Sequence, residues 1–236
     1  MAKKKIEIKK YKDIILPKCD EPYDVPENWF WTTMGNIGQW GSGGTPSRSH
    51  DEYYNGNIPW IKTGELKNCI IYDTEEKITE LAIDKSSAKI FPINTVMIAM
   101  YGATIGQVGI MGVEATTNQA CACVVASDFV DYEYIFYYAI SQKNAFIKKG
   151  KGGAQPNISQ EIIKGHPIPI PPINEQHRIV ERVKGFIEKL DLADELCGGL
   201  DKIEPIKLAI FNQAFKGKLQ TNIHDEPNAW FDLGGE

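Results

Sequence analysis

The sequence predicts an α+β fold, in which a mixed β-sheet with short flanking helices is followed by a long helical arm. Short β-rich runs, separated by Gly, Asn and Pro, fill residues 26–172. Alternating prolines over residues 166–172 then forbid a helix. Beyond them, apolar residues recur at intervals of four and three, the spacing of a coiled-coil seam. We therefore expect four regions, namely a leader (1–25), a globular domain (26–172), a helical arm (173–220) and a tail (221–236).

Three strands are expected in the globular domain. Residues 95–100 and 121–125 are apolar runs typical of buried strands, and residues 104–110 alternate with interspersed glycines. Asn55-Gly56 lies between two aromatic or apolar segments, which predicts a tight turn.

Capping residues predict the helix boundaries of this domain. Thr79 is expected to cap a helix over residues 80–85. Asp131 is expected to cap a longer helix, which continues past Phe146 and ends at Gly150 in a left-handed conformation.

The arm follows the proline-rich segment 166–172, which is interpreted as a hinge. Asn174 is the expected N-cap of its first helix, and Pro205 stands near the first turn of a second helix. The apolar stripe of the first helix consists of Ile179, Val183, Phe186, Leu190, Ala193, Cys197 and Leu200. The stripe fits a hairpin packed on its own domain and equally an exposed coiled coil that pairs with a partner, because heptads do not distinguish the two.

Composition restricts the class of protein. The net charge of −5 argues against nucleic-acid binding, because domains that coat phosphates are usually basic, but lysines gather over residues 3–18 and 143–151 and allow a local basic face. No apolar run reaches the roughly 18–20 residues that a membrane-spanning helix needs, and the N-terminus lacks the pattern of a secretory signal. We therefore expect a cytoplasmic protein.

The five cysteines are scattered and odd in number, which argues against a disulfide framework. Cys121 and Cys123 alternate as on one face of a buried strand, and no second Cys or His pair stands at a zinc-like spacing. Core packing is therefore favoured over a metal site, and no metal is expected.

A series of short motifs, in order along the chain, resembles the specificity subunits of Type I restriction–modification systems. The motifs are Pro26-Glu27-Asn28-Trp29, residues 42–47, residues 58–62, Ile78-Thr79-Glu80, residues 101–106, Asn118-Gln119-Ala120, residues 155–159, residues 171–176 and residues 212–219. Together they span residues 25–220 and correspond to one half of such a subunit.

The resemblance implies a DNA target-recognition domain over residues 26–172 and a conserved helical arm. Members of this family usually carry two recognition domains, each of which reads one half of a split DNA site, joined by two helices that set the spacing and bind methyltransferase subunits. The expected partners are therefore double-stranded DNA, a methyltransferase subunit and potentially a restriction subunit. S-adenosylmethionine is expected on the methyltransferase partner, and no cofactor on this chain.

This chain departs from the family pattern, because it has one domain and one arm. It is either a naturally short subunit that pairs with a second copy or part of a longer one, and its Met start and non-repeating tail favour the former. The expected dimer or partner interface consists of Ile179, Val183, Phe186, Leu190, Ala193 and Leu200.

The polar residues of three segments are the candidate DNA contacts. Residues 41–46 lack the terminal Lys-Ser/Thr of a nucleotide-binding loop and favour a structural turn, yet Arg48 beside them can bind a phosphate or a guanine edge. Residues 148–157 combine lysines, which neutralise phosphates, with two amides that can pair with adenine, although a solvated flexible loop remains the alternative. The candidates are Thr45, Ser47, Arg48, Lys62, Thr63, Tyr101, Thr104, Lys149, Lys151, Gln155 and Asn157.

No catalytic constellation is found in the sequence. The glycines at positions 102, 106, 109 and 112 lack the G-x-G core of a dinucleotide or S-adenosylmethionine loop, and no His stands in a triad-like motif. We therefore expect a non-catalytic subunit. Two rival hypotheses are a stand-alone DNA-modifying enzyme and a decoy that occupies methyltransferase subunits without binding DNA.

Overall fold

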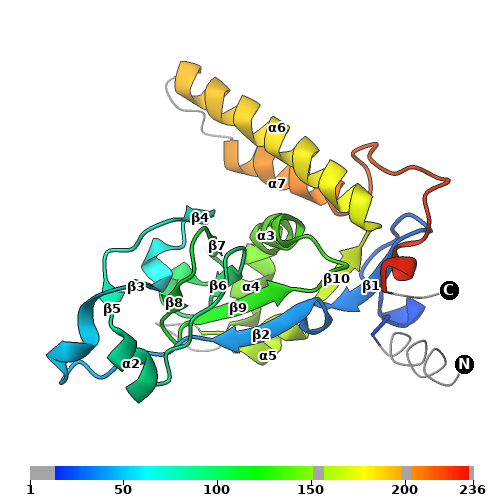
Figure 1. Ribbon diagram of the computed structural model, residues 1–236. Coiled ribbons are helices and arrows are strands. Elements are labelled where there is room, and N and C mark those ends of the chain that lie inside the picture. Colours follow the sequence, from blue (N-terminus) through cyan, green and yellow to red (C-terminus); the bar gives the residue numbers. More distant parts are fainter. Residues whose placement is uncertain (1–13, 151–156, 198–202, 234–236) are drawn as a thin grey trace, which may run out of the picture. The chain divides into compact units, whose positions relative to one another are not determined.

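The computed structural model describes residues 14–150, 157–197 and 203–233 (Figure 1). The chain forms two compact units, which are interleaved in sequence. The first unit takes residues 1–37, 128–141 and 165–236, and the second takes residues 38–127 and 142–164. Mixed sheets and a long helix confirm the predicted α+β class. The expected domain of residues 26–172 contributes to both units, so its functional boundaries stay a prediction.

The second unit contains a five-stranded mixed sheet. Its order is β2 (Gly38–Ser42), β9 (Cys121–Ala126), β6 (Val96–Ala99), β7 (Val108–Met111) and β4 (Cys69–Ile71), with only β4 and β7 parallel. The two apolar runs predicted as buried strands are confirmed as β6 and β9, at the centre of the sheet. Every residue of β6 is buried, which explains why its sequence does not alternate with polar residues. Cys121 and Cys123 lie in the core as expected, and burial raises the pKa of both thiols.

A smaller sheet in the same unit has the order β5 (Lys77–Ile78), β3 (Tyr54–Ile61) and β8 (Thr116–Thr117). The turn predicted at Asn55-Gly56 is wrong, because both residues lie inside β3. Tyr54 and Ile58 both pair with Ile78, so the residues between them form a bulge, and Asn55 has a φ of 58°. A Cβ at position 56 would lie 2.2 Å from the Ile78 carbonyl oxygen, which explains the glycine.

The third predicted strand is shorter than expected. Residues Gly102–Thr104 form a 3-10 turn, and β7 begins only at Val108. Gly106, between them, has a φ of 74°, a conformation that glycine adopts without strain. Gly106 therefore belongs to the turn, whereas Gly109 lies inside β7.

Among the described helices, α2 (Glu80–Lys85) matches its prediction, and the Thr79 hydroxyl accepts a hydrogen bond from the Ala82 amide at 3.2 Å. The single helix expected from Asp131 to Gly150 is wrong. Its Asp131 cap is confirmed, but α3 (Tyr132–Ser141) and α4 (Lys143–Lys149) are separate helices divided at Gln142. Gly150 has a φ of −62° and forms no left-handed cap. The second unit also contains α5 (Gln160–Lys164).

In the first unit, β1 (Phe30–Thr33) pairs antiparallel with β10 (Pro167–Ile170). The proline-rich segment is extended as predicted, but the hinge interpretation is wrong, because β10 is a paired strand. The hydroxyls of Tyr138 and Tyr134 donate to the carbonyls of Pro167 and Pro169 at 2.6 and 2.7 Å. Proline has no N–H and cannot donate a hydrogen bond to a neighbouring strand, but its carbonyl still accepts one. These two hydrogen bonds attach β10 to α3.

The arm is an antiparallel pair of helices in the first unit, α6 (Ile173–Cys197) and α7 (Ile203–Ala214), which lie side by side in Figure 1. Asn174 is not the N-cap, because α6 already includes Ile173, whose amide donates to Asp232 at 2.9 Å. Lys207 on α7 pairs with Asp191 on α6 at 2.7 Å. In the described part of the chain, no helix is long and apolar enough to cross a bilayer.

A buried carboxylate, Glu175, joins the start of α6 to two distant segments. It accepts hydrogen bonds from the Trp29 indole at 2.7 Å, from the Asn222 amide at 2.8 Å and from the Thr221 hydroxyl at 3.2 Å. Burial raises the pKa of Glu175, although the three donors oppose the shift. Residues near both ends of the described chain therefore meet at this helix.

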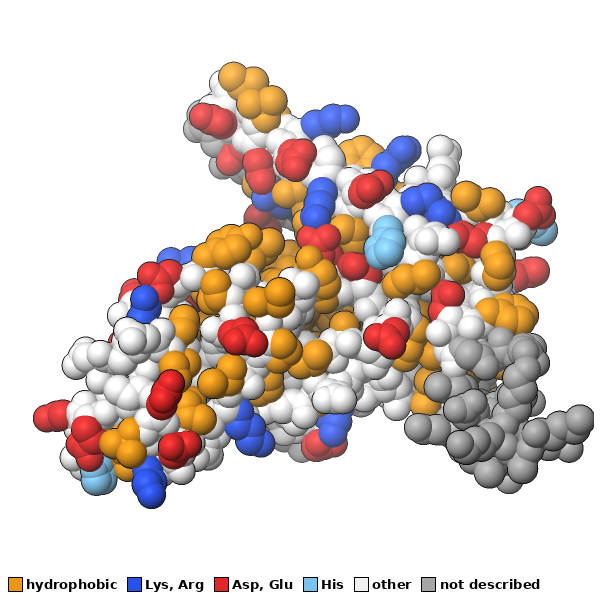
Figure 2. Space-filling model, in the orientation of Figure 1, with side chains coloured by type: hydrophobic (Ala, Val, Ile, Leu, Met, Phe, Trp, Pro, Cys, Tyr) orange, Lys and Arg blue, Asp and Glu red, His pale blue; other side chains and the backbone are white. Residues whose placement is uncertain are grey.

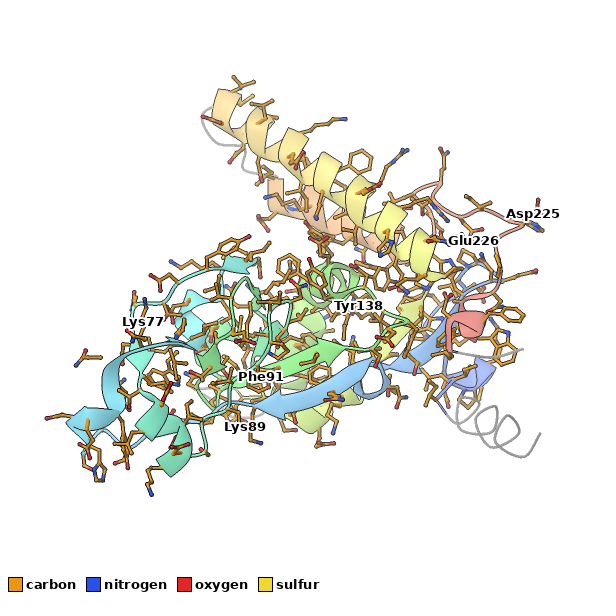
Figure 3. All side chains as sticks on the ribbon, viewed as in Figure 1. Lys77, Lys89, Phe91, Tyr138, Asp225 and Glu226 are labelled. Atoms are coloured by element: carbon orange, nitrogen blue, oxygen red, sulfur yellow. The ribbon has the colours of Figure 1, made fainter. Side chains whose placement is uncertain are left out.

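The C-terminal tail adds two further contacts of the same kind. The Ala229 amide donates to the Asn28 carbonyl at 2.8 Å. Arg178 on α6 pairs with Glu226, and in Figure 3 Glu226 lies beside α6 whereas Asp225 points outward. The tail thus packs against both the N-terminal segment around Asn28 and the helix α6 of the first unit.

Candidate nucleic-acid interface

The loop between β8 and β9 consists of residues 118–120, and together with the flanking strand residues Thr117 and Cys121 we call it the 117–121 loop. It brings together three segments that the sequence singled out. The Asn118 amide donates to the Ile61 carbonyl at 3.0 Å, directly before Lys62. The amide of Gly44, which directly precedes Thr45, donates to the Thr117 carbonyl at 2.9 Å. The third segment is that of Tyr101. The amide of Met100, which directly precedes Tyr101, donates to the Ala120 carbonyl at 2.9 Å.

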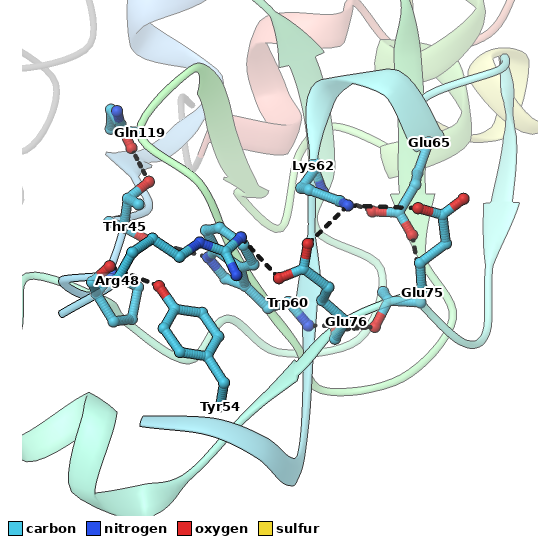
Figure 4. A network of polar contacts seen from close by, with 12 residues as sticks. Thr45, Arg48, Tyr54, Trp60, Lys62, Glu65, Glu75, Glu76 and Gln119 are labelled. Atoms are coloured by element: carbon cyan, nitrogen blue, oxygen red, sulfur yellow. Dashed lines mark hydrogen bonds and ion pairs between the residues drawn. The ribbon is translucent and has the colours of Figure 1, made fainter. Parts of the chain in front are cut away.

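Gln119 stands at the centre of this loop, and its side chain is exposed. The Thr45 hydroxyl donates a hydrogen bond to Gln119 Oε1 (Figure 4). The Asn118 side chain closes the loop from inside, because its Oδ1 accepts from the Ala120 amide at 3.2 Å. Sequence reasoning used Asn118-Gln119-Ala120 only as a family motif and missed Gln119 as a site residue. A pair of amides between two short strands was the signal that could have found it.

Three predicted contacts gather beside this loop. The main chains of Tyr101 and Asn157 form an antiparallel bridge, and the Ile158 amide donates to the Met100 carbonyl at 2.9 Å. Tyr101 is exposed, and the Thr104 hydroxyl donates to its carbonyl at 2.8 Å. The structure thus places Tyr101, Thr104 and Asn157 together, although they come from separate segments.

We call this region the amide surface, and it consists of Thr45, Tyr101, Thr104, Asn118, Gln119 and Asn157. Apart from the short stretch that carries Thr45, it is built from residues 95–113, 115–127 and 141–160, which contain no Asp or Glu. The last of these stretches carries Lys143, Lys148, Lys149 and Lys151. Lys148 and Lys149 are exposed at the C-terminal end of α4, whereas Lys151 and Gln155 lie outside the described residues. The local composition therefore favours an anionic partner.

A second region has the opposite electrostatic character. We call it the Arg48 clamp, and it consists of Arg48, Tyr54, Trp60, Lys62, Glu75 and Glu76 (Figure 4). The Arg48 guanidinium lies 4.2 Å from the Tyr54 ring centroid and 5.3 Å from that of Trp60, and its Nη2 is 2.7 Å from Glu76 Oε2. Lys62 Nζ is 3.0 Å from Glu76 Oε1, and its other carboxylate partner is Glu75, at 3.3 Å.

The pKa values of the clamp agree with this pairing. The hydrogen bond to Glu76 raises the pKa of Lys62, and the bonds from Lys62 and Arg48 lower the pKa of Glu76. Arg48 and Lys62 were both predicted to contact DNA. In this structure, carboxylates of the same chain already neutralise them.

The clamp also fixes the glycine-rich loop that precedes Arg48. The Trp60 ring is buried, and its Nε1 donates to the Gly44 carbonyl at 3.0 Å. The Tyr54 hydroxyl donates to the Pro46 carbonyl at 2.6 Å. Residues 41 and 42 belong to β2, and residues 43–46 are an irregular loop rather than the turn that the sequence favoured. These contacts hold Thr45 against the 117–121 loop.

Two other predicted contacts have local partners. Ser47 is exposed, and its hydroxyl is 2.7 Å from that of Ser49. Thr63 is half-buried and opens the 3-10 turn Thr63–Glu65, in which Glu65 accepts from the Lys62 amide at 2.7 Å. These contacts shape loops and leave the role of both residues in DNA binding a prediction.

An open hollow of about 940 Å³ lies beside the clamp. Arg48 and Lys77 are the cations that line it, against the four carboxylates of Asp51, Asp73, Glu75 and Glu76. Lys77 is itself paired with Asp73 at 3.0 Å. This hollow repels phosphate and is the less suitable of the two regions for a DNA backbone. Within the described ranges, no group of His, Cys, Asp and Glu is arranged to hold a metal ion.

The predicted partner interface on α6 divides into two halves. Ile179 and Val183 are buried within the first unit. Further along the helix, Phe186, Leu190 and Ala193 are half-buried, and Leu200 lies outside the described residues. Near the end of α6, Leu192 and Leu196 are 56% and 78% exposed, and Figure 2 shows hydrophobic side chains at this end of the helix. The first half therefore serves internal packing, and a role of the second half in assembly stays a prediction.

Comparison with known proteins agrees with the resemblance seen in the sequence. Residues 26–196 match the family described as "Type I restriction modification DNA specificity domain". The chain is 33% identical over 179 residues to the Type I restriction enzyme EcoR124I/EcoR124II specificity subunit of Escherichia coli, covering 73% of this chain and 43% of the relative. It is 31% identical over 196 residues to the Type I restriction enzyme MjaIX specificity subunit of Methanocaldococcus jannaschii, covering 81% and 44%.

Solved structures share the fold at lower sequence identity. The HsdS subunit from Thermoanaerobacter tengcongensis has a TM-score of 0.59 at 18% identity, covering 91% of this chain and 50% of that one. A chain from a structure of the type I R-M system, determined to explain its complex assembly and conformational transition, has a TM-score of 0.61, also at 18% identity, covering 91% and 52%. The chain thus spans about half the length of the proteins it matches. The family match over most of the chain, together with the shared fold, shows that the chain belongs to the family of Type I restriction–modification DNA specificity domains.

Proposed function

We propose that this chain is the sequence-recognition part of a Type I restriction–modification assembly and binds duplex DNA through the amide surface. The observation that carries the proposal is the convergence of exposed polar groups on the 117–121 loop, in segments that lack acidic residues. Family membership supports the same conclusion.

The chemistry of the surface fits two tasks in DNA binding. Exposed amides and hydroxyls can hydrogen-bond to base edges in the major groove, where each base pair presents a distinct pattern of donors and acceptors. Lysines at the end of α4 can neutralise phosphates and so position the protein without reading sequence. One such surface covers one half of a split site.

The remaining parts of the proposal concern the assembly. We infer that α6 and α7 dock a methyltransferase subunit, which binds S-adenosylmethionine and performs the reaction, so that the chain itself is not an enzyme. A second recognition surface comes from a second copy of the chain or from the rest of a longer chain. Two identical copies related by a two-fold axis would read an inverted repeat. The assembly would act in the cytoplasm.

The proposal is tested by co-expressing the chain with the methyltransferase subunit of a Type I system from the same organism, in a host without DNA methylation. Methylated positions are then mapped by long-read sequencing. We expect an interrupted motif that disappears when the chain is omitted, with inverted-repeat halves if two copies assemble. Methylation that is unchanged without the chain would contradict the proposal.

The decoy hypothesis has its own supporting observation, because the acidic hollow and the net charge of −5 both oppose DNA binding. It predicts a stable complex with the methyltransferase subunit and no binding of duplex DNA at any salt concentration. The enzyme hypothesis predicts turnover by the isolated chain with Mg²⁺ and S-adenosylmethionine. We expect DNA binding that weakens steeply as salt rises, and no turnover.

A further inference from the structure

The side chain of Gln119 combines exposure with a fixed orientation. Its Oε1 accepts a hydrogen bond from the Thr45 hydroxyl, and Thr45 is its side-chain partner among the described residues. The loop that carries it is tied to the main chains of Ile61 and Met100 through Asn118 and Ala120. An exposed glutamine normally samples many rotamers, and here the carboxamide is oriented in advance.

The opposite loop is fixed just as firmly. A Cβ at Gly43 would lie 1.9 Å from the Thr117 carbonyl oxygen, so only glycine allows the two loops to approach this closely. Beyond Thr45, Pro46 accepts from the Tyr54 hydroxyl. The Thr45 hydroxyl therefore stands on a backbone that has little freedom to move away from Gln119.

The bond from Thr45 decides which end of the carboxamide remains for a partner. With Oε1 occupied, Gln119 offers mainly the two N–H groups of Nε2. A donor of this kind suits an acceptor on DNA, such as a phosphate oxygen, guanine O6 or N7, or thymine O4. It is less suited to adenine, whose bidentate recognition uses the oxygen and the nitrogen of an amide together.

We propose that Gln119 is a DNA-contacting residue that donates from Nε2 to an acceptor on the duplex, and that Thr45 is its positioning residue. This inference rests on the proposed function, since it names a contact within the same surface. Because the carboxamide is already oriented, little side-chain entropy is lost when the contact forms.

The test compares four substitutions in the full chain bound to its methyltransferase partner. Gln119→Glu keeps the shape and an acceptor for Thr45 but removes the donor. Thr45→Val removes the hydroxyl, whereas Thr45→Ser retains it. Gln39→Glu is the matched control, because Gln39 is exposed on β2, pairs with Val125 and lies away from the 117–121 loop. Circular dichroism checks that each variant is folded.

Affinity is measured by fluorescence anisotropy on two duplexes, one with the motif that the wild-type complex methylates and one unrelated. We expect Gln119→Glu to weaken binding about tenfold or more, as the loss of one good contact would. Thr45→Val should weaken DNA binding several-fold, whereas Thr45→Ser, which keeps the hydroxyl, should bind like wild type. The affinity of Gln39→Glu should stay within about twofold of wild type. Equal losses on both duplexes assign the acceptor to phosphate, and a loss confined to the motif assigns it to a base.

The inference is overturned if Gln119→Glu binds the motif as tightly as Gln39→Glu does. A loss with Thr45→Val that Thr45→Ser does not restore would overturn the positioning role. If the wild-type complex binds neither duplex, the proposed function itself fails, and this result is distinct because it precedes any comparison of variants.

Discussion

The Arg48 clamp and the amide surface share one loop, yet they use polar side chains in opposite ways. In the clamp, Arg48 and Lys62 are held by carboxylates and aromatic rings of the same chain. On the amide surface, the exposed side chain of Gln119 accepts a hydrogen bond from Thr45 at its Oε1, and among the described residues Thr45 is its side-chain partner. The comparison teaches that a residue's type does not tell whether its hydrogen-bonding capacity remains for a partner.

The largest expected difference between the two regions concerns stability. Trp60 is 3% exposed, so Trp60→Ala should destabilise the fold by about 3–5 kcal/mol. Tyr101 is 46% exposed, so Tyr101→Ala should change stability by less than about 0.5 kcal/mol while weakening DNA binding several-fold. Urea unfolding followed by tryptophan fluorescence and by circular dichroism measures the first effect. Equal destabilisation by the two substitutions would erase the distinction between clamp and surface.

The next prediction, of intermediate size, compares how lysines of the two regions affect the salt dependence of DNA affinity. Replacing Lys148 with Gln should lower the slope of log K against log salt by about 0.9, the contribution of one phosphate contact. Lys62→Gln should leave the slope almost unchanged, because Glu75 and Glu76 already neutralise Lys62. The measurement is a salt titration of DNA affinity with an unrelated duplex. A larger change of slope for Lys62→Gln than for Lys148→Gln would reverse the assignment of the two regions.

The smallest expected effect is the pH dependence of the clamp. The hydrogen bonds from Lys62 and Arg48 hold the pKa of Glu76 below its ordinary value of 4.5. A lowered carboxyl pKa stabilises the fold above pH 4.5, and this contribution disappears as the pH falls through the folded-state value. The stability difference between wild type and Glu76→Gln should therefore be greatest near neutral pH, stay under about 1 kcal/mol, and shrink in acid. A difference that grows on acidification would contradict this account of Glu76.

Local signals in the sequence predicted part of the local structure. The cap at Thr79 and the apolar runs of β6 and β9 depend on neighbours within a few residues, and all three are confirmed. The caps expected at Asn174 and Gly150 are equally local, and both are wrong. Another error arose where distant contacts decide. Asn55-Gly56 fits a turn or a bulge equally well, and pairing with Ile78 selects the bulge.

The same limit applies to the candidate site. Sequence reasoning chose Tyr101 and Asn157, which the fold brings together. It also favoured Arg48, and it had no means to foresee that Glu76, which directly precedes β5, would neutralise it. Gln119 was missed although the adjacent amides of Asn118 and Gln119 are visible in the sequence, because the convergence of loops around them is a property of the tertiary structure.

The closure of the first unit by its tail has a consequence for synthesis on the ribosome. Asn28 emerges long before its partners Asn222 and Ala229, because 194 residues separate Asn28 from Asn222. Because Asn222 and Trp29 meet at Glu175, that carboxylate also gains its full set of donors only after Asn222 has been translated. Residues 38–164, which include the whole second unit, are translated before this closure, so the nascent chain can present a folded amide surface while the first unit is still open.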